Sequence, residues 1–353
     1  MNIDDFKRPL IISGPCSAES EQQVYETCKR LKDGGRVNVL RAGIWKPRTR
    51  PNSFEGVGAV GLPWLIKAGK ELDLPVITEV ANALHVEEAL KAGFKNLWIG
   101  ARSTVNPFTV QEIADSLRGV EGLTVMIKNP INPDLALWIG AFERFKMVGQ
   151  NDLHAIHRGF SLHRKTKYRN EPMWEIPLAF KNEIPEAKMI CDPSHIAGNR
   201  ELLKPVSQKA LDLVYDGLMI ESHITPDEAW SDAAQQITPE TLTELVNGLT
   251  IRSVESSNEE IEENLDSMRS EVNQVDAEII QLIATRMGII ERIGDFKKDN
   301  SITILQPERW AEIQRLQTEK GNELGLSDSF ILQYLEVIHQ ESIRRQTKIM
   351  NEG

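Results

Sequence analysis

The 353-residue sequence has few cysteines and no long apolar run. Its three cysteines, Cys16, Cys28 and Cys191, form no CxxC pair, so neither a disulfide framework nor a zinc ribbon is expected. No apolar run reaches the ~18–20 residues that a membrane-spanning helix needs. The first residues, MNIDDFKRPLII, have no signal-peptide pattern. These absences predict a soluble, cytoplasmic protein without a membrane partner.

The sequence also lacks an excess of positive charge. Its net charge is −11, whereas nucleic acids and anionic membranes require a basic surface, so neither is expected as a partner. The acidic excess is uneven. Residues 1–252 carry 32 acidic and 30 basic side chains, a net of −2, and residues 253–353 carry the remaining 20 and 11, a net of −9. This shift indicates two parts, and the length also suits about two domains.

Up to about residue 247, short β-rich runs alternate with helical stretches. Eight runs are typical of strands: residues 9–14, 37–42, 75–80, 96–101, 124–128, 154–159, 188–191 and 217–220. Amphipathic stretches such as 21–32, 61–72 and 198–214 lie between them. Such alternation predicts a parallel sheet, and eight units favour an α/β fold, the (β/α)8 or TIM barrel, over residues 1–250. A doubly wound sheet is the alternative, although it usually has fewer strands.

The remainder of the chain has a helical pattern. The polar stretch IRSVESSNEE, at residues 251–260, is interpreted as a linker. Apolar residues from Ile261 to Phe296 then step by three and four, which predicts one long helix. Two shorter helices are expected at 308–320 and 327–348. Residues 261–353 are thus expected to form an all-α domain of three helices.

The predicted first helix is unusually long for a domain of this size. At ~1.5 Å per residue, roughly 40 residues would extend for about 60 Å. Its apolar face would therefore extend beyond the other two helices. We expect this face to pack against a second chain, which predicts a homodimer through the helical domain.

Each β-rich run ends in a polar or charged residue, and in a barrel these strand ends share one mouth, where active sites lie. One group of these residues is cationic: Arg41, Lys46, Arg48, Arg102, Lys128 and Arg158. Arg and Lys are suited to phosphate and carboxylate, so their convergence predicts a site for anionic substrates. A solvated basic rim is the alternative. The basic run RKTKYR, at residues 164–169, is interpreted as ordinary surface or a loop.

A second group is suited to binding a metal: Cys16, His195, Glu221 and Asp232. One sulfur, one nitrogen and two carboxylates fit Mn²⁺, Fe²⁺, Co²⁺ or Zn²⁺ better than Mg²⁺, and Mn²⁺ is expected first. A lone cysteine at a strand end is more often a small buried apolar residue. A metal site is favoured because three of the four residues end strands at the same mouth.

The motifs GPCS, RAGxxKPRTxP, TEV, GAR, HRGF, DPSH and IESH, in this order over about residues 8–245, resemble those of 3-deoxy-D-arabino-heptulosonate-7-phosphate (DAHP) synthase. The resemblance implies condensation of phosphoenolpyruvate with erythrose 4-phosphate and release of phosphate. It also implies that the four candidate ligands bind the metal. The phosphoenolpyruvate site would consist of Arg41, Lys46, Arg102, Lys128 and Arg158.

The same resemblance assigns Arg48 and Thr49, within KPRT, to the aldehyde sugar phosphate, with Glu79 lining the same cavity. The sister family, which makes the eight-carbon acid sugar phosphate, shares the barrel but lacks KPRT. That motif favours DAHP synthase. Lys46 and His195 are the candidates for moving protons.

In the tail, Arg286 occupies the apolar seam of the long helix, where an unpaired charge is costly. Lys297 lies 11 residues later, about 20° around the helix, and therefore on the same side. Arg269 precedes Arg286 by 17 residues, roughly 25 Å along a straight helix, so it does not easily reach the same ligand in its own chain, but an antiparallel partner chain could deliver it. A dimerisation coiled coil with surface charges is the alternative.

Residues 261–350 resemble an all-helical chorismate mutase of the intertwined-dimer type. The resemblance implies a ligand site formed by Arg269, Arg286, Lys297, Arg309, Ser342 and Gln346. In the rearrangement of chorismate to prephenate, Arg286 and other cations would hold the two carboxylates, while Lys297 and Gln346 would stabilise charge on the ether oxygen.

One position departs from this pattern. The family commonly has a glutamate after Arg309, and this chain has Trp310. Either Glu308 or Glu312 substitutes for it, or the mutase activity is reduced.

Together the two resemblances predict a bifunctional enzyme whose mutase domain also senses chorismate or prephenate and inhibits the barrel. The alternative for the tail is a non-catalytic sensing and dimerisation module.

Overall fold

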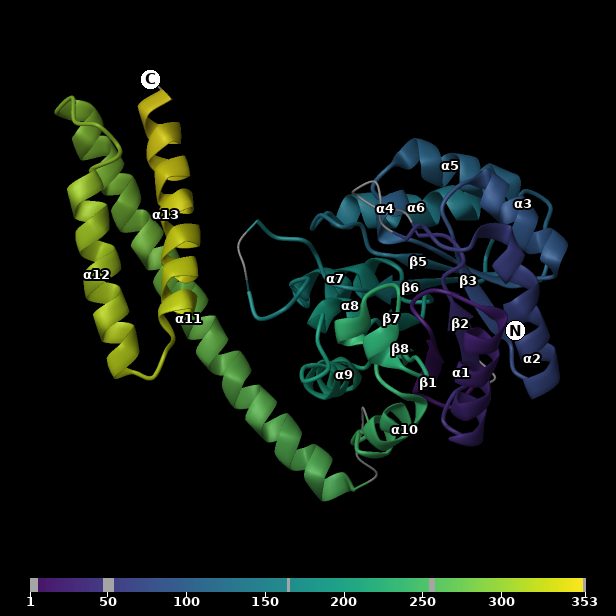
Figure 1. Cartoon of the computed structure of the whole chain (residues 1–353). Coiled ribbons are helices and arrows are strands. Elements are labelled where there is room, and N and C mark those ends of the chain that lie inside the picture. The colour runs from purple at the N-terminus through teal and green to yellow at the C-terminus, as the bar shows by residue number, and fades with distance from the viewer. Residues whose placement is uncertain (1–5, 47–53, 164–165, 254–257, 352–353) are drawn as a thin grey trace. The chain divides into compact units, whose positions relative to one another are not determined.

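The computed structural model describes residues 6–46, 54–163, 166–253 and 258–351. The chain divides into two compact units, Met1–Val254 and Glu255–Gly353 (Figure 1). The division lies within the stretch predicted as a linker, and the long helix of the second unit begins at Glu259, before the predicted end of that stretch.

The first unit is a closed barrel of eight parallel strands in chain order, as predicted. The strands are β1 Leu10–Gly14, β2 Val39–Ala42, β3 Val76–Val80, β4 Asn96–Ile99, β5 Thr124–Lys128, β6 Leu153–His157, β7 Met189–Cys191 and β8 Gly217–Glu221. Gly14 of β1 lies opposite Glu221 of β8, which closes the barrel. The doubly wound alternative is therefore excluded.

Helices surround the strands (Figure 1). They are α1 Glu21–Asp33, α2 Leu62–Leu72, α3 Ala83–Ala92, α4 Ala101–Thr104, α5 Pro107–Ser116, α6 Leu135–Met147, α7 Glu175–Glu183, α8 Pro193–Ala197, α9 Leu203–Asp212 and α10 Pro239–Asn247, with short 3-10 turns at Gly58–Gly61, Pro226–Glu228 and Ala233–Gln235.

Helix α1 illustrates how the sequence determines these elements. The Ser20 side chain accepts a hydrogen bond from the backbone N–H of Gln23, a capping contact that contributes about 1 kcal/mol. Val24, Cys28 and Leu31 follow at helical spacing and are buried in the layer between strands and helices. The helix therefore presents one apolar face to the barrel.

Inside the barrel, alternate strand residues fill the core. This inner cluster contains Leu10, Ile12, Val39, Ile77, Trp98, Met126, Ile156, Ile190 and Met219. The remaining strand positions face the helices. Charged residues such as Arg41, Lys128 and Glu221 occur only near the carboxyl ends of these described strands. The charged side chains of the strands therefore lie at one mouth of the barrel.

For one predicted helix, the predicted first residue is wrong. The pattern predicted a helix over 198–214, but Gly198 has a φ of 71° and ends α8, and α9 begins at Leu203. A left-handed residue stops a helix because its carbonyl and amide no longer follow the helical direction.

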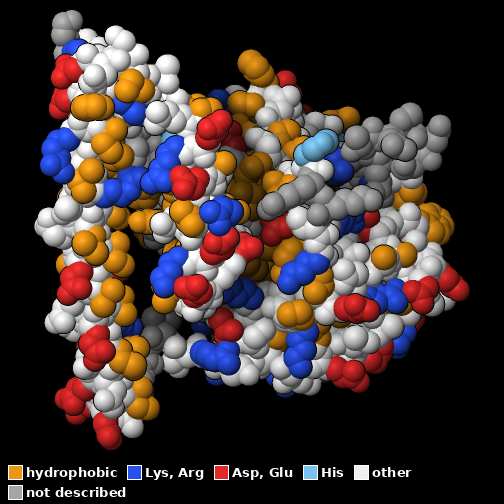
Figure 2. All heavy atoms as spheres, turned by 90° about the vertical axis from the view of Figure 1, so that its left-hand side faces the viewer, with side chains coloured by type: hydrophobic (Ala, Val, Ile, Leu, Met, Phe, Trp, Pro, Cys, Tyr) orange, Lys and Arg blue, Asp and Glu red, His pale blue; other side chains and the backbone are white. Residues whose placement is uncertain are grey.

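The second unit consists of three helices, α11 Glu259–Asp299, α12 Pro307–Glu323 and α13 Asp328–Asn351 (Figure 1). Helix α11 has 41 residues, so at ~1.5 Å per residue it extends for about 60 Å. Its amino-terminal half extends beyond α12 and α13, and large apolar side chains there remain exposed, among them Ile261, Met268, Val272 and Val275. Hydrophobic side chains are visible along the surface of this unit in Figure 2.

No helix in the described ranges combines the length and apolar character needed to cross a membrane.

Candidate active sites

The carboxyl ends of the barrel strands form a polar pocket. It is lined by Lys46, Glu79, Ala101, Arg102, Lys128, Arg158, His195 and Asp232. Seven of these eight residues were predicted as site residues, and each comes from a different segment at the carboxyl ends of strands β2 to β8. Arg48 and Thr49 lie outside the described residues.

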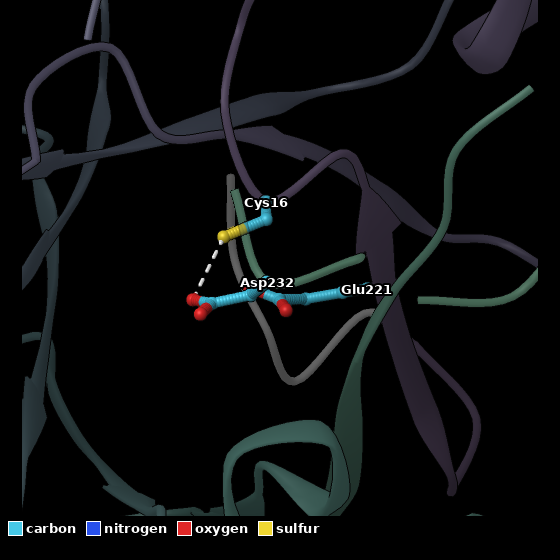
Figure 3. A group of neighbouring side chains, drawn as sticks. All are labelled: Cys16, Glu221 and Asp232. Atoms are coloured by element: carbon cyan, nitrogen blue, oxygen red, sulfur yellow. Dashed lines mark hydrogen bonds between the residues drawn. The ribbon is translucent and has the colours of Figure 1, made fainter. Parts of the chain in front are cut away.

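Three of the four predicted metal ligands form a tight group in this region. One ligand atom each from Cys16, Glu221 and Asp232 lie within 4.8 Å of one another (Figure 3). Cys16 Sγ is 3.4 Å from Asp232 Oδ2. The fourth, His195, lies beside the group, with its Nε2 3.9 Å from Glu221 Oε1.

The donor atoms of this group fit a divalent transition metal. Glu221 is fully buried, and its Oε1 accepts no hydrogen bond, although the Arg41 guanidinium lies 3.2 Å away as an ion-pair partner. The side chain is otherwise fixed, because Gln235 Nε2 donates to its Oε2 at 2.6 Å. A cation bound by these residues would satisfy the remaining oxygen.

The protonation states also suit metal binding. Burial lowers the pKa of His195, against the opposing effect of Asp192, so the imidazole is neutral near pH 7. Burial opposes ionisation of Asp232, but the Arg169 guanidinium and the other neighbouring cations, Lys46 among them, together outweigh it and hold the pKa of this carboxyl well below its usual range. Burial and the Glu221 carboxylate raise the pKa of Cys16 to about 12, so its thiolate forms readily only beside a cation.

His195 is oriented by a second carboxylate. Asp192 caps α8 by accepting from the backbone N–H of His195, and it also contacts His195 Nδ1 at 2.8 Å. Nε2 is therefore the nitrogen directed at the Glu221 side, the arrangement in which a histidine ligand is held by an outer carboxylate.

Two cations of the mouth, Arg41 and Lys128, form buried ion pairs with carboxylates. Arg41 is 1% exposed and lies 3.2 Å from Glu221 Oε1, and Lys128 donates to Asp192 at 2.8 Å. Both lie over the ring of Trp98, at 4.7 and 5.7 Å from its centre. These pairs offset the cost of burying the charges.

Lys46, Arg102 and Arg158 complete the positive lining of the pocket. Lys46 Nζ is 3.2 Å from Cys16 Sγ, which places it next to the candidate metal ligands. Burial lowers the pKa of Arg158 to about 10, so its guanidinium still carries its charge at neutral pH.

The helical unit contains a second pocket of about 380 Å³. Its polar lining includes Arg286 and Lys297 from α11, Arg309 from α12, and Ser342 and Gln346 from α13. Five of the six tail residues predicted for a ligand site are therefore brought together.

The contacts within this pocket leave hydrogen-bonding capacity for a ligand. Arg286 Nη1 donates to Ser342 Oγ at 2.8 Å, and Lys297 Nζ donates to the Ile304 carbonyl at 2.6 Å. Gln346 Oε1 is buried without a hydrogen-bond partner. Two cations and an amide therefore face a partly apolar pocket.

Arg269 is the predicted residue that lies elsewhere. Its side chain is 58% exposed and pairs with Asp266 one turn earlier on α11. Trp310 lines the pocket and stacks on His339, with ring centres 3.8 Å apart. Glu308 and Glu312 are not among the lining residues described, and Glu312 pairs with Arg309.

Comparison with known proteins gives a family match in each unit. The model of the DAHP synthetase I family matches residues 3–254. The chain belongs to this family. The model of chorismate mutase type II matches residues 268–347, which contain Arg269 and the five clustered tail residues.

Individual relatives cover the barrel. Phospho-2-dehydro-3-deoxyheptonate aldolase of Thermotoga maritima is 32% identical over 236 residues, 67% of this chain and 67% of that protein. A crystal structure of a DAHP synthase from the same organism superimposes with a TM-score of 0.62 at 27% identity, covering 70% of each chain. 2-Dehydro-3-deoxyphosphooctonate aldolase of Desulfotalea psychrophila is 27% identical, over 68% of this chain and 88% of its own.

Sequence reasoning missed three residues of the DAHP synthase barrel. Trp98 reads as an ordinary strand residue, yet it lies beneath two cations. Asp192, the first residue of the DPSH motif, received no role, although its position three residues before His195 is the spacing of a helix cap. Arg169 was interpreted, within RKTKYR, as ordinary surface or a loop; it does lie in a loop, but it also binds Asp232 at 3.0 Å, a role that this interpretation missed.

Proposed function

We propose that the barrel condenses phosphoenolpyruvate with erythrose 4-phosphate and water to give DAHP and phosphate. The observation that carries this proposal is the convergence of the Cys16, Glu221 and Asp232 group with Lys46, Arg102 and Arg158 at one barrel mouth. This combination suits a reaction between two anionic substrates, and the match over residues 3–254 supports the same reaction.

In this proposal Cys16, His195, Glu221 and Asp232 hold a divalent metal, with Mn²⁺ first and Fe²⁺, Co²⁺ or Zn²⁺ as alternatives. When bound, the metal supplies Lewis acidity toward the aldehyde carbonyl. Lys46, Arg102, Lys128 and Arg158 line the pocket and bind and orient phosphate and carboxylate groups, and Arg41, paired with Glu221, adds a buried positive charge to the same site.

Two groups are candidates for moving protons, Lys46 and His195. Lys46 Nζ lies beside Cys16 Sγ. His195 Nε2 faces Glu221 and would be taken up by the metal, so we assign proton transfer during the condensation to Lys46. Glu79 lines the same pocket, and Arg48 and Thr49 are assigned to the sugar phosphate on their KPRT motif alone.

Comparing erythrose 4-phosphate with arabinose 5-phosphate as co-substrate, with and without chelator, tests the barrel proposal. We expect phosphate release from phosphoenolpyruvate with the four-carbon sugar only, loss of activity with chelator, and recovery with Mn²⁺. Preference for arabinose 5-phosphate would contradict the proposed DAHP synthesis and would indicate the reaction of the eight-carbon synthases, which also occur among the relatives.

For the helical unit, we propose rearrangement of chorismate to prephenate in the pocket between α11, α12 and α13. Arg286 and Arg309 bind the two carboxylates, and Ser342 holds the Arg286 guanidinium. Lys297 donates to the ether oxygen, as does the amide of Gln346 once a ligand orients it. Because the reaction is pericyclic, positioning and charge stabilisation suffice and no nucleophile is required.

A homodimer through α11 completes this proposal. Packing of a second chain would bury the exposed apolar side chains of its amino-terminal half, and an antiparallel partner could deliver Arg269 to the pocket. Arg269→Ala in the full chain should then reduce mutase activity without affecting the barrel reaction. Unchanged mutase activity would assign Arg269 to the surface.

One observation favours a second candidate for the helical unit, a non-catalytic module that senses chorismate or prephenate. Trp310 takes the place of a carboxylate in the pocket. Prephenate formation by wild type and by Arg286→Ala separates the candidates. A catalytic site requires activity in the wild type that falls about 10²–10³-fold in the variant, as for the loss of one charge-stabilising donor. Feedback on the barrel is tested by whether either compound inhibits DAHP formation.

A further inference from the structure

The segment 166–171 returns to the barrel mouth after the loop that follows β6. Glu171 pairs with Phe160 through two backbone hydrogen bonds of 2.7 and 2.8 Å. The backbone N–H of Arg169 donates to the Ile196 carbonyl in α8 at 3.0 Å. The segment is therefore held on both sides, between the end of β6 and helix α8.

Two glycines make room for it. Gly159 and Gly198 have φ values of 75° and 71°, in the left-handed region. A Cβ atom at Gly159 would lie 2.7 Å from the Asn170 carbonyl oxygen, and one at Gly198 would lie 2.4 Å from Arg169 Cβ. The backbone at Gly159 and Gly198 is thus shaped to fit Arg169 and Asn170.

Arg169 reaches two of the candidate metal ligands. Its Nη1 donates to Asp232 Oδ1 at 3.0 Å and to Gln235 Oε1 at 2.6 Å. Gln235 in turn donates to Glu221 Oε2 at 2.6 Å. One guanidinium therefore holds Asp232 directly and Glu221 through a single amide.

Asn170, the next residue, reaches the anion-binding side of the pocket. Its Oδ1 accepts from Arg158 Nη1 at 2.8 Å, and its Nδ2 donates to the His195 carbonyl at 2.6 Å. Both Asn170 and Arg158 are buried, at 4% and 7% exposure, so an alternative partner for the guanidinium would have to come from the protein or the substrate.

We infer that Arg169 and Asn170 are positioning residues with separate tasks. Arg169 holds the carboxylate metal ligands through their side chains, whereas Asn170 holds the Arg158 guanidinium and touches only the backbone of His195. Neither acts on the reacting atoms. The inference rests on the proposed function, because it takes Cys16, Glu221 and Asp232 as a metal site. Outer residues that orient ligands in this way commonly alter metal affinity by about 10–100-fold when they are replaced.

Co²⁺ titration of the metal-free full chain, followed by its visible absorption, tests the task of Arg169. Arg169→Gln should raise the Co²⁺ dissociation constant about 10-fold or more. Arg200→Gln is the matched control, because Arg200 binds Asp227 and the carbonyls of Ala233 and Gln236 in the same loop without touching Asp232. It should leave the Co²⁺ dissociation constant within about twofold of wild type.

The task of Asn170 is tested by steady-state kinetics at saturating metal. Asn170→Ala should raise the KM for phosphoenolpyruvate about 10-fold, the scale for a lost hydrogen bond to a charged group, and leave Co²⁺ affinity within about threefold. Arg169→Gln should show the reverse pattern. Its Co²⁺ affinity should be weakened, whereas its KM for phosphoenolpyruvate at saturating metal should stay close to that of wild type.

Three results would overturn the inference. Equal Co²⁺ affinity in wild type and Arg169→Gln would show that Arg169 does not position the metal ligands, and the proposed metal site would still stand. An equal loss in Arg200→Gln would show that loop stability alone was measured. Absence of Co²⁺ binding in wild type would overturn the metal site of the proposed function and this inference together.

Discussion

The barrel mouth and the helical pocket both gather cations around a space for anions, but they differ in how much of the site one chain supplies. In the barrel, Arg41 and Lys128 pair with Glu221 and Asp192 inside a closed core. In the helical unit, Arg269 lies on an exposed surface and much of α11 is uncovered. A closed barrel can complete a site from its own strand ends, whereas three helices with one long member leave apolar surface uncovered.

The largest expected effect concerns the barrel alone. Cys16→Ala removes the only sulfur ligand of the candidate group and should raise the Co²⁺ dissociation constant by about 100-fold or more, because removing a ligand exceeds the effect of removing its outer partner. Co²⁺ absorption of the full chain measures it.

Cys28→Ala is the matched control for this variant. Cys28 is equally buried but lies in α1, within the apolar layer. It should lower thermal stability slightly and leave Co²⁺ binding unchanged. Retention of tight Co²⁺ binding in Cys16→Ala would show that the Cys16 sulfur is not a metal ligand.

The next effect concerns the helical unit. Val272 and Val275 lie on the apolar seam of α11 and are 58% and 55% exposed. Replacing both by Asp should dissociate the proposed dimer, since burying each valine contributes about 1.5 kcal/mol and a buried carboxylate opposes association. Molar mass by light scattering should halve, and mutase activity should fall, whereas DAHP formation should persist.

Asn273→Asp controls for the added charge, because residue 273 lies about 160° around the helix from residue 275. It should leave the molar mass unchanged. An unaltered molar mass in the double variant would contradict dimerisation through this seam.

The smallest effect concerns Trp310. Its ring stacks on His339 and lines the helical pocket. Trp310→Glu would introduce an acceptor for a ligand hydroxyl, and one net hydrogen bond corresponds to a change in mutase kcat/KM of about 3–10-fold. Trp310→Phe retains an aromatic wall and should change kcat/KM less. Equal effects in the two variants would indicate that aromatic packing alone matters at this position.

Much of the barrel could be predicted because its strands, helices and mouth are specified by short stretches of neighbouring residues. Alternating β-rich and helical runs specify strands and helices, and a polar residue at each strand end identifies the mouth. The seam position of Arg286 and the spacing to Lys297 likewise follow from helix geometry. Both residues do line one pocket.

The rest depends on contacts between distant segments. Arg169 reaches Asp232 only because residues 166–171 fold back between β6 and α8, and nothing in RKTKYR distinguishes it from surface charge. Trp98 gains its role from Arg41 and Lys128 on two other strands. Arg309 and Gln346 entered the prediction through family resemblance, since neither carries a local signal.

The central claim is that one chain holds two separate catalytic sites, and measuring both reactions in the same two variants tests it most directly. DAHP formation and prephenate formation would be assayed in full-length wild type, Cys16→Ala and Arg286→Ala. The account predicts that Cys16→Ala loses DAHP formation and keeps prephenate formation within about twofold, and that Arg286→Ala shows the reverse, with a loss of about 10²–10³-fold. Loss of both reactions in either variant, or a wild type that forms only one product, would contradict it.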